Sequence, residues 1–180
     1  MTPSMDRKAL TLAVFKACYR TGNFKLRSGQ TSTEYFDKYR FEAQPQILRA
    51  VAQHLLKSIP SDTQALAGLE MGGIPIATAL SLESGLPCVF VRKKAKDYGT
   101  EQFAEGLEIQ GKKLLVVEDV VTTGGQVILS TEDLRRTGAI ITDVLCVIQR
   151  SKDLSPFTEK SLKLHSLFTM DELKNSAVSI

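Results

Sequence analysis

Residues 114–126 read Leu-Leu-Val-Val-Glu-Asp-Val-Val-Thr-Thr-Gly-Gly-Gln, and this stretch decides the fold class. The run 114–117 is entirely apolar, two acids follow it, and a Thr-Gly turn then leads into a helical pattern over 126–136 that Gly138 ends. A short apolar run without polar alternation is typical of a strand buried on both faces, as in parallel sheets. The stretch therefore predicts a buried strand, a glycine turn and a helix.

The same kinds of element recur on both sides of this stretch. Apolar runs at 65–69, 88–91 and 143–148 predict three further buried strands, and helical spacing predicts helices over 44–58 and 75–84. Buried strands that alternate with helices indicate an α/β fold, with a doubly wound, mainly parallel sheet covered on both faces. Ligands of such sheets bind beyond the carboxyl ends of the strands.

No repeat, low-complexity tract or linker interrupts the pattern. We expect one domain over 1–180, made of an N-terminal region over 1–43, a core over 44–150 and a C-terminal segment over 151–180. The C-terminal segment is expected to be a terminal helix or strand with a packing role.

Composition excludes several classes of protein. The 180 residues are 43% hydrophobic and 24% charged, as in a globular domain. No apolar run approaches the roughly 20 residues of a membrane helix, so we expect a cytoplasmic protein that does not bind a membrane. The 23 basic residues exceed the 20 acidic ones by only +3, which disfavours a nucleic-acid partner. Cys18, Cys88 and Cys146 have no metal-ligand spacing and are predicted to be reduced core residues.

The turn at residues 122–126 has the features of an anion-binding site. Backbone N–H groups at a helix N-terminus, glycines that permit close approach and Thr hydroxyls together suit a phosphate monoester. Glu118 and Asp119 would repel that phosphate on contact, so we expect them to hold sugar hydroxyls. The spacing fits neither a Walker loop nor a dinucleotide fingerprint. The alternative is an Asp-capped turn without a ligand.

The segment 92–100 reads Arg-Lys-Lys-Ala-Lys-Asp-Tyr-Gly-Thr, with four cations in its first five residues. Such cations suit an anionic ligand and can stabilise negative charge that develops on a departing group. Gly99 and Gly106 bracket a polar stretch that suits a lid able to exclude water. The alternative is a solvated basic surface.

Three further stretches carry weaker signals. Residues 24–37 combine aromatic residues and hydroxyls in a predicted hairpin, where hydrophobic packing is the alternative role of the aromatics. Residues 68–75 form a Gly-rich loop after a predicted strand. Arg150 ends the last predicted strand, and its planar guanidinium suits a carboxylate, although a surface Arg is the alternative.

Taken together in their order along the chain, these motifs resemble those of type I phosphoribosyltransferases, which use phosphoribosyl pyrophosphate (PRPP). Residues 116–126 match the PRPP signature of that family, with Glu118 where many members have Asp. Residues 92–99 resemble the catalytic loop of its orotate phosphoribosyltransferase branch, with Tyr98 where many members have His. Residues 24–37 resemble the hood of that branch, with Arg27 where many members have Lys. The resemblance covers roughly residues 20–150.

The resemblance implies a role for each matching residue. It assigns PRPP binding to Arg27, Met71, Gly72, Arg92, Lys93, Lys96, Tyr98, Glu118, Asp119, Val120, Val121, Thr122, Thr123, Gly124, Gly125 and Gln126. It assigns catalysis to Lys96, Glu118 and Asp119, and orotate binding to Tyr35, Phe36, Thr122 and Arg150. Gly72 stands where some members carry Lys, so only backbone roles carry over to Met71 and Gly72, and Gln149 stands where relatives have an acid.

The implied reaction is the transfer of phosphoribosyl from PRPP to orotate, which gives orotidine 5′-monophosphate and pyrophosphate in pyrimidine biosynthesis. The implied cofactor is Mg²⁺, held mainly by substrate oxygens and water, with no metal ligand from the protein. A homodimer is implied in which the lid loop 92–106 acts on the neighbouring subunit's site. Two alternatives stay open: transfer to another base, such as a purine, and a non-catalytic PRPP sensor that binds nucleic acid.

Overall fold

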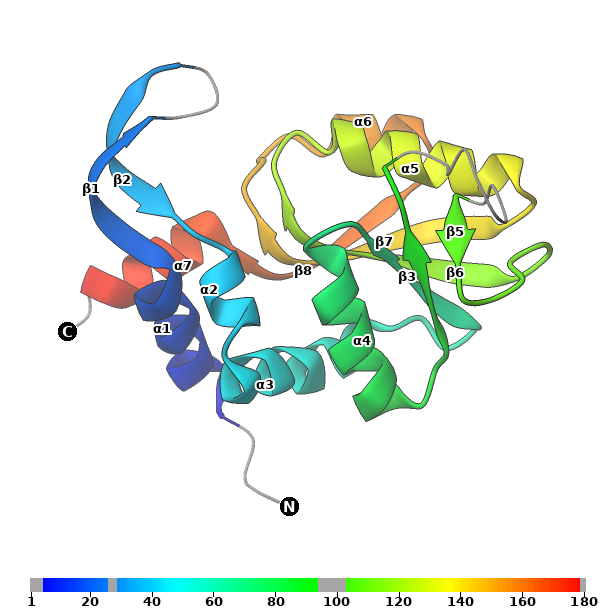
Figure 1. Cartoon of the computed structure of the whole chain (residues 1–180), viewed down its shortest axis with the longest axis horizontal. Helices are drawn as coiled ribbons and strands as arrows, with labels where there is room; N and C mark the ends of the chain where they lie inside the picture. The colour runs from blue at the N-terminus through cyan, green and yellow to red at the C-terminus, as the bar shows by residue number, and fades with distance from the viewer. Residues whose placement is uncertain (1–4, 26–28, 94–102, 179–180) are drawn as a thin grey trace.

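The computed structural model describes residues 5–25, 29–93 and 103–178 of the chain (Figure 1). Its helices are α1 (Arg7–Cys18), α2 (Tyr39–Glu42), α3 (Pro45–Leu55), the 3-10 turn η1 (Leu56–Ser58), α4 (Gly73–Ser84), α5 (Gly125–Arg136), α6 (Ser155–Glu159) and α7 (Met170–Val178). Its strands are β1 (Tyr19–Lys25), β2 (Thr31–Phe36), β3 (Ala65–Leu69), β4 (Cys88–Val91), β5 (Ala104–Glu105), β6 (Lys113–Val121), β7 (Ile140–Gln149) and β8 (Lys163–Thr169).

The central sheet has six strands in the order β5-β4-β3-β6-β7-β8. Every neighbouring pair is parallel except β4 and β5, which are antiparallel. The predicted doubly wound, mainly parallel α/β sheet is therefore confirmed. A separate antiparallel hairpin, β1–β2, confirms the hairpin predicted near the N-terminus and projects beside the sheet (Figure 1).

Successive side chains of the buried strands point into two different cores. In β6, Leu115 and Val117 join the core beneath α1, α3 and α4, whereas Leu114 and Val116 join the core beneath α5 and α6. Both faces of the sheet are thus apolar, which explains why these strands lack polar alternation in the sequence.

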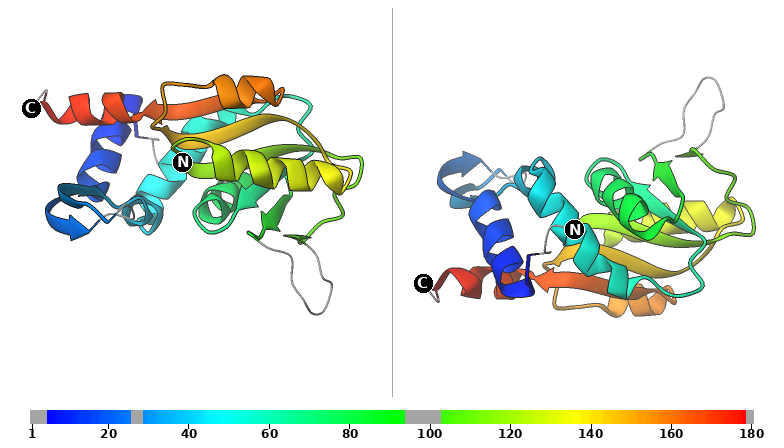
Figure 2. Two further views of the ribbon diagram at one scale, coloured as in Figure 1. Left: turned by 90° about the horizontal axis from the view of Figure 1, so that it is seen from above. Right: turned by 90° about the horizontal axis from the view of Figure 1, so that it is seen from below.

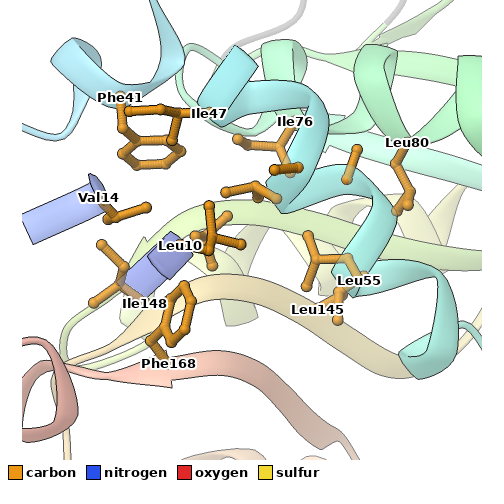
Figure 3. Close-up of a cluster of buried hydrophobic side chains, with 14 of the residues drawn as sticks. Leu10, Val14, Phe41, Ile47, Leu55, Ile76, Leu80, Leu145, Ile148 and Phe168 are labelled. Atoms are coloured by element: carbon orange, nitrogen blue, oxygen red, sulfur yellow. The ribbon is translucent and has the colours of Figure 1, made fainter. Parts of the chain in front are cut away.

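The first of these cores ties the N-terminal region to the sheet. Leu10 and Val14 of α1 are fully buried and lie near Ile148 of β7 and Phe168 of β8 (Figure 3). No element was predicted over residues 7–18, yet Asp6 caps a helix there by accepting a hydrogen bond from the amide of Ala9 at 2.8 Å.

Two predicted helices differ from the observed ones at their ends. The helix predicted over 44–58 is α3 followed by the 3-10 turn η1. The helix predicted from Pro75 begins two residues earlier, at Gly73. Pro75 then lies in the first turn, where a missing N–H removes no intrahelical hydrogen bond. Gly85, with φ +77°, ends this helix in the left-handed region that favours glycine.

The C-terminal segment contains two helices, α6 and α7, and the strand β8, where a single terminal helix or strand was predicted. β8 pairs in parallel with β7, and α7 packs against α1 (Figure 2). His165 lies within β8, where its Nε2 is 2.7 Å from Oδ1 of Asp143. Arg7 Nη2 lies 3.1 Å from Glu172 Oε1 and so connects the first and last helices.

The three cysteines are free, as predicted. Cys18 and Cys146 are buried and Cys88 is half-buried within β4. Burial raises the pKa of Cys18 to about 12 and raises that of Cys146 still further. The thiols of Cys18 and Cys146 are therefore protonated at neutral pH and belong to the core.

Candidate active site

A cavity of about 560 Å³ opens where several elements end. The hairpin strand β2 and the segments that follow β3, β6 and β7 all contribute to its walls. Its position beyond the carboxyl ends of parallel strands is the one that the fold class predicted. The predicted site residues that line it are Tyr35, Phe36, Met71, Gly72, Lys93, Glu118, Val120, Val121, Thr122, Thr123, Gly124, Gly125, Gln126 and Arg150.

The turn 122–126 forms the N-terminal entry to α5, as predicted. Gly124 has φ +81°, and a Cβ atom there would lie 2.3 Å from Cε2 of Phe157 in α6. Only glycine therefore fits at this position. The first amides of α5 have no intrahelical acceptor and border the cavity, which provides N–H donors and a positive helix end for an anion.

The two acids lie inside a strand and not after it, which corrects the predicted end of the strand at Val117. β6 continues because its pairing with β7 extends to Val121 and Gln149. Glu118 lines the cavity with 9% of its surface exposed. Asp119 is fully buried, and the cavity wall in the described structure does not include it.

The electrostatics of these acids are set by burial and by each other. Burial, aided by the adjacent Asp119 carboxylate, raises the pKa of Glu118 to about 9. Burial also acts to raise the pKa of Asp119, but the hydrogen bond from Glu118 and the ammonium of Lys38 hold it below the usual value. At neutral pH, Glu118 thus carries a proton in the free site, whereas Asp119 is ionised.

Sequence reasoning missed the partners of Asp119. Lys38 Nζ lies 2.6 Å from Asp119 Oδ2, and the Lys38 side chain lines the cavity. Glu42, one helical turn along α2, is buried against the same carboxylate, and its Oε1 has no hydrogen-bond partner within the described ranges. In sequence, Lys38 and Glu42 look like an ordinary surface pair at i, i+4, so no signal marks them.

The loop after β3 brings its backbone close to the acids. A Cβ atom on Gly72 would lie 1.8 Å from Asp119 Oδ2, so the position excludes any side chain. Met71 is 60% exposed and Gly72 borders the cavity beside it. Glu70, which sequence reasoning did not single out, also lines the wall. The loop therefore offers backbone groups and one acid, but no cation.

The hairpin contributes aromatic side chains to the cavity wall. Tyr35 and Phe36 both line the cavity, and Tyr39 of α2, which was not predicted, joins them. The rings of Tyr35 and Phe24 lie 5.4 Å apart, so Tyr35 also packs within the hairpin. The packing role and the cavity role of these aromatics are thus compatible.

Arg150 follows β7 and lines the cavity. Its amide donates to the carbonyl of Val121 at 2.8 Å, which fixes its backbone next to the phosphate turn. The side chain of Gln149 points elsewhere: its amide donates to Ser151 O at 2.9 Å and accepts from Ser166 Oγ at 3.0 Å. Gln149 therefore anchors the strand end to β8, while Arg150 remains at the cavity.

The basic segment after β4 is only partly described. Lys93 lines the cavity. Arg92 does not belong to the wall in the described structure, and its Nε lies 3.3 Å from Oε1 of Glu105 on β5. The predicted residues Lys96 and Tyr98 lie outside the described residues, as does Arg27 of the hairpin.

Within the described ranges, no group of three or more His, Cys, Asp or Glu side chains could hold a metal ion. No helix there is both long and apolar enough to cross a membrane.

Comparison with known proteins identifies the family. The model of the phosphoribosyl transferase domain matches residues 39–168. An orotate phosphoribosyltransferase of a Nocardioides species is 48% identical over 157 residues, which cover 87% of this chain and 88% of that protein. The chain belongs to the orotate phosphoribosyltransferases. It is thus an enzyme of the pentosyltransferase class that serves pyrimidine biosynthesis.

Other members of the orotate phosphoribosyltransferase family match the chain over nearly its whole length. The protein of this name from Methanocaldococcus jannaschii is 37% identical over 175 residues, with 96% of this chain and 99% of the relative covered. The crystal structure of the Mycobacterium tuberculosis enzyme superposes with a TM-score of 0.84 at 26% identity, covering 94% and 99% of the two chains. The family and fold expected from the sequence are therefore confirmed.

Proposed function

We propose that this chain transfers the phosphoribosyl group of PRPP to orotate, giving orotidine 5′-monophosphate and pyrophosphate. One observation carries the proposal: one cavity is lined by the phosphate turn, the acid Glu118, the loop after β3, aromatic rings of the hairpin region and Arg150. Each matches one chemical part of the two substrates. The names of the family's members support orotate as the base.

The sugar and its 5′-phosphate fit the wall formed by β6 and α5. The phosphate would accept hydrogen bonds from amides of 122–126 and from the hydroxyls of Thr122 and Thr123. Glu118 faces the cavity and would accept hydrogen bonds from ribose hydroxyls, with Asp119 behind it. The N–H donors of the turn 122–126 thus match the negative phosphate, and the acids of β6 match the neutral ribose hydroxyls.

Orotate fits the wall formed by the hairpin and the end of β7. The rings of Tyr35 and Phe36 offer flat apolar surfaces to a pyrimidine. The guanidinium of Arg150 would bind the orotate carboxylate through two parallel hydrogen bonds. Purines carry no such carboxylate, so this pairing favours orotate over a purine base.

The chemistry needs no nucleophile from the protein. The ring N–H of orotate is acidic and releases its proton to water, and the nitrogen then attacks the anomeric carbon and forms the new C–N bond. The C–O bond to pyrophosphate breaks, and its electron pair leaves with the pyrophosphate. Positive charge that develops on the sugar is stabilised by the acids of β6, and charge on the leaving group by Arg92, Lys93 and Lys96.

The donor set near the cavity fits a Mg²⁺ ion that is bound mainly by the substrate. Carboxylate oxygen is a ligand type that Mg²⁺ accepts, and Glu118 is an acid of the cavity wall that could face such an ion. When bound, Mg²⁺ neutralises diphosphate charge. The protein's part is to bind, orient and shield the two substrates.

We further propose a homodimer in which the loop 92–106 covers the neighbouring subunit's cavity. The proposal rests on the family resemblance of this loop. By this resemblance, Lys96 would contact the leaving pyrophosphate and Tyr98 would lie next to Lys96. Sedimentation of the purified chain would measure the number of subunits.

The test is the loss of the ultraviolet absorbance of orotate on mixing with PRPP and Mg²⁺. We expect loss with orotate and none with hypoxanthine, adenine or uracil. Lys96→Ala should slow turnover by about a hundredfold or more, because it removes a cation from the developing charge. Lys57→Ala, on η1, is the matched control and should retain full activity.

Two outcomes would contradict the proposal. Turnover of a purine in place of orotate would move the assignment to another base. PRPP binding without turnover of any base would indicate a sensor.

A further inference from the structure

The acid predicted to bind ribose is covered by a lysine. Asp119 has no exposed surface, and Lys38 Nζ lies 2.6 Å from its Oδ2. The Lys38 side chain is 32% exposed and forms part of the cavity wall. Of this ion pair, only the lysine faces the space that a substrate would enter.

The helix α2 holds the lysine in this place. Lys38 directly precedes α2, and Glu42 at its end is buried beside the same carboxylate. The ammonium also lies 5.2 Å from the centre of the Tyr39 ring. Lys38 thus stands among two acids and an aromatic face, an environment that favours a positive charge.

The loop 70–73 next to Lys38 lacks a cation of its own. Residues 70–73 read Glu-Met-Gly-Gly, and Gly72 cannot carry a side chain because its Cβ would collide with Asp119. Within the described part of the cavity wall, the basic residues are Lys38, Lys93 and Arg150. Lys38 is the one of these that lies beside Asp119 and therefore beside Gly72.

We propose that Lys38 is an exchangeable counter-ion, which neutralises Asp119 in the free enzyme and moves to the diphosphate of PRPP when ribose hydroxyls take its place. This inference rests on the proposed use of PRPP.

The exchange leaves no buried charge without a partner. A buried carboxylate that loses its only cation is costly, but ribose hydroxyls would donate hydrogen bonds to Asp119. The ammonium sits on a flexible four-carbon chain and needs only a short movement to reach an anion in the same cavity. Lys38 would thereby supply the cation that the loop at Gly72 cannot carry.

The test compares three ligands that separate the two ends of PRPP. Calorimetry in the presence of Mg²⁺ measures binding of pyrophosphate, ribose 5-phosphate and PRPP to the wild type and to Lys38→Met. We expect pyrophosphate and PRPP to bind the variant about tenfold more weakly or worse, because a charged contact is lost. Ribose 5-phosphate should bind equally well or more tightly, because its hydroxyls no longer compete with the ammonium.

Controls separate this role from a structural one. Arg40→Met removes a cation from α2. The Nε of Arg40 donates to Ala17 O, and Arg40 does not line the cavity. This variant should therefore change none of the three affinities. Lys38→Arg keeps the charge and should recover part of the pyrophosphate affinity. If Lys38→Met does not fold, Lys38→Met/Asp119→Asn removes both charges together and should still bind pyrophosphate weakly.

Several results would overturn the inference. Parallel loss of all three ligands would make Lys38 a structural residue, and unchanged pyrophosphate affinity in either Met variant would exclude contact with the diphosphate. The proposed function fails in a different way, by absence of PRPP binding or orotate turnover in the wild type.

Discussion

At the scale of single residues, the site depends on carboxyl groups that are crowded and buried. Glu42, Glu118 and Asp119 share one region with a single ammonium, that of Lys38. Burial raises the pKa of Glu42 to about 8, with the Asp119 charge adding to the effect, and that of Glu118 to about 9. The free site thus limits its own negative charge by keeping protons.

These raised pKa values predict that the free enzyme loses stability as pH increases. Between about pH 5 and 8, the folded chain holds protons that the unfolded chain has released, so the free energy of unfolding falls with pH. Each such group contributes up to about 1.4 kcal/mol per pH unit. Melting temperatures measured from pH 5.5 to 8 should therefore decline, and Glu42→Gln should flatten the decline.

The control for this prediction is Glu83→Gln. The pKa of Glu83 is lowered by hydrogen bonds from Gln53 and Arg49, so its removal should leave the decline as steep as in the wild type. A decline that persists unchanged in Glu42→Gln would contradict the assignment.

At the scale of elements, the short helix α6 supports the phosphate turn. Phe157 is 1% exposed, and its ring lies so close to Gly124 that no Cβ fits there. The ring belongs to the core beneath α5. α6 therefore packs beneath the turn and supports it, although it lies about thirty residues further along the chain.

We expect Phe157→Ala to lower the free energy of unfolding by about 3–5 kcal/mol because it leaves a cavity in the core. The turn above would lose its support, so ribose 5-phosphate should also bind more weakly. Denaturant unfolding and calorimetry measure the two effects. Thr158→Ala, at the exposed neighbouring position, should change neither stability nor affinity. A Phe157→Ala variant that is destabilised but binds ribose 5-phosphate normally would refute the supporting role of α6.

At the scale of the whole molecule, the N-terminal region shares the core of the sheet. Leu10 lies in one buried cluster with residues of α3, α4, β7 and β8 (Figure 3). α7 packs on α1 and so connects the two ends of the chain. We therefore propose that residues 1–180 form a single domain.

Leu10→Ala should lower the free energy of unfolding by about 2–5 kcal/mol and keep one cooperative transition. Circular dichroism in the far and near ultraviolet should report the same midpoint. Lys8→Ala, an exposed change on the same helix, should have little effect. Separate transitions for the hairpin region and the sheet would show that two units fold independently.

The parallel α/β sheet, the phosphate turn and most of the residues of the cavity wall could be predicted from the sequence alone. These features are local: an apolar run predicts a buried strand, and the turn 122–126 combines glycines and hydroxyls within five residues. The end of β6 was predicted wrongly because pairing with β7, and not local composition, carries the strand through Glu118 and Asp119.

Only the tertiary structure decided which groups meet across the site. Lys38 and Asp119 are 81 positions apart, and Gly124 and Phe157 belong to different elements. Contacts between distant residues depend on how helices pack on the sheet, and no local periodicity encodes them. Packing buries Asp119 beneath Lys38 and Gly72. Burial raises the pKa of Glu118, whereas the hydrogen bond from Glu118 and the ammonium of Lys38 hold the pKa of Asp119 below its usual value.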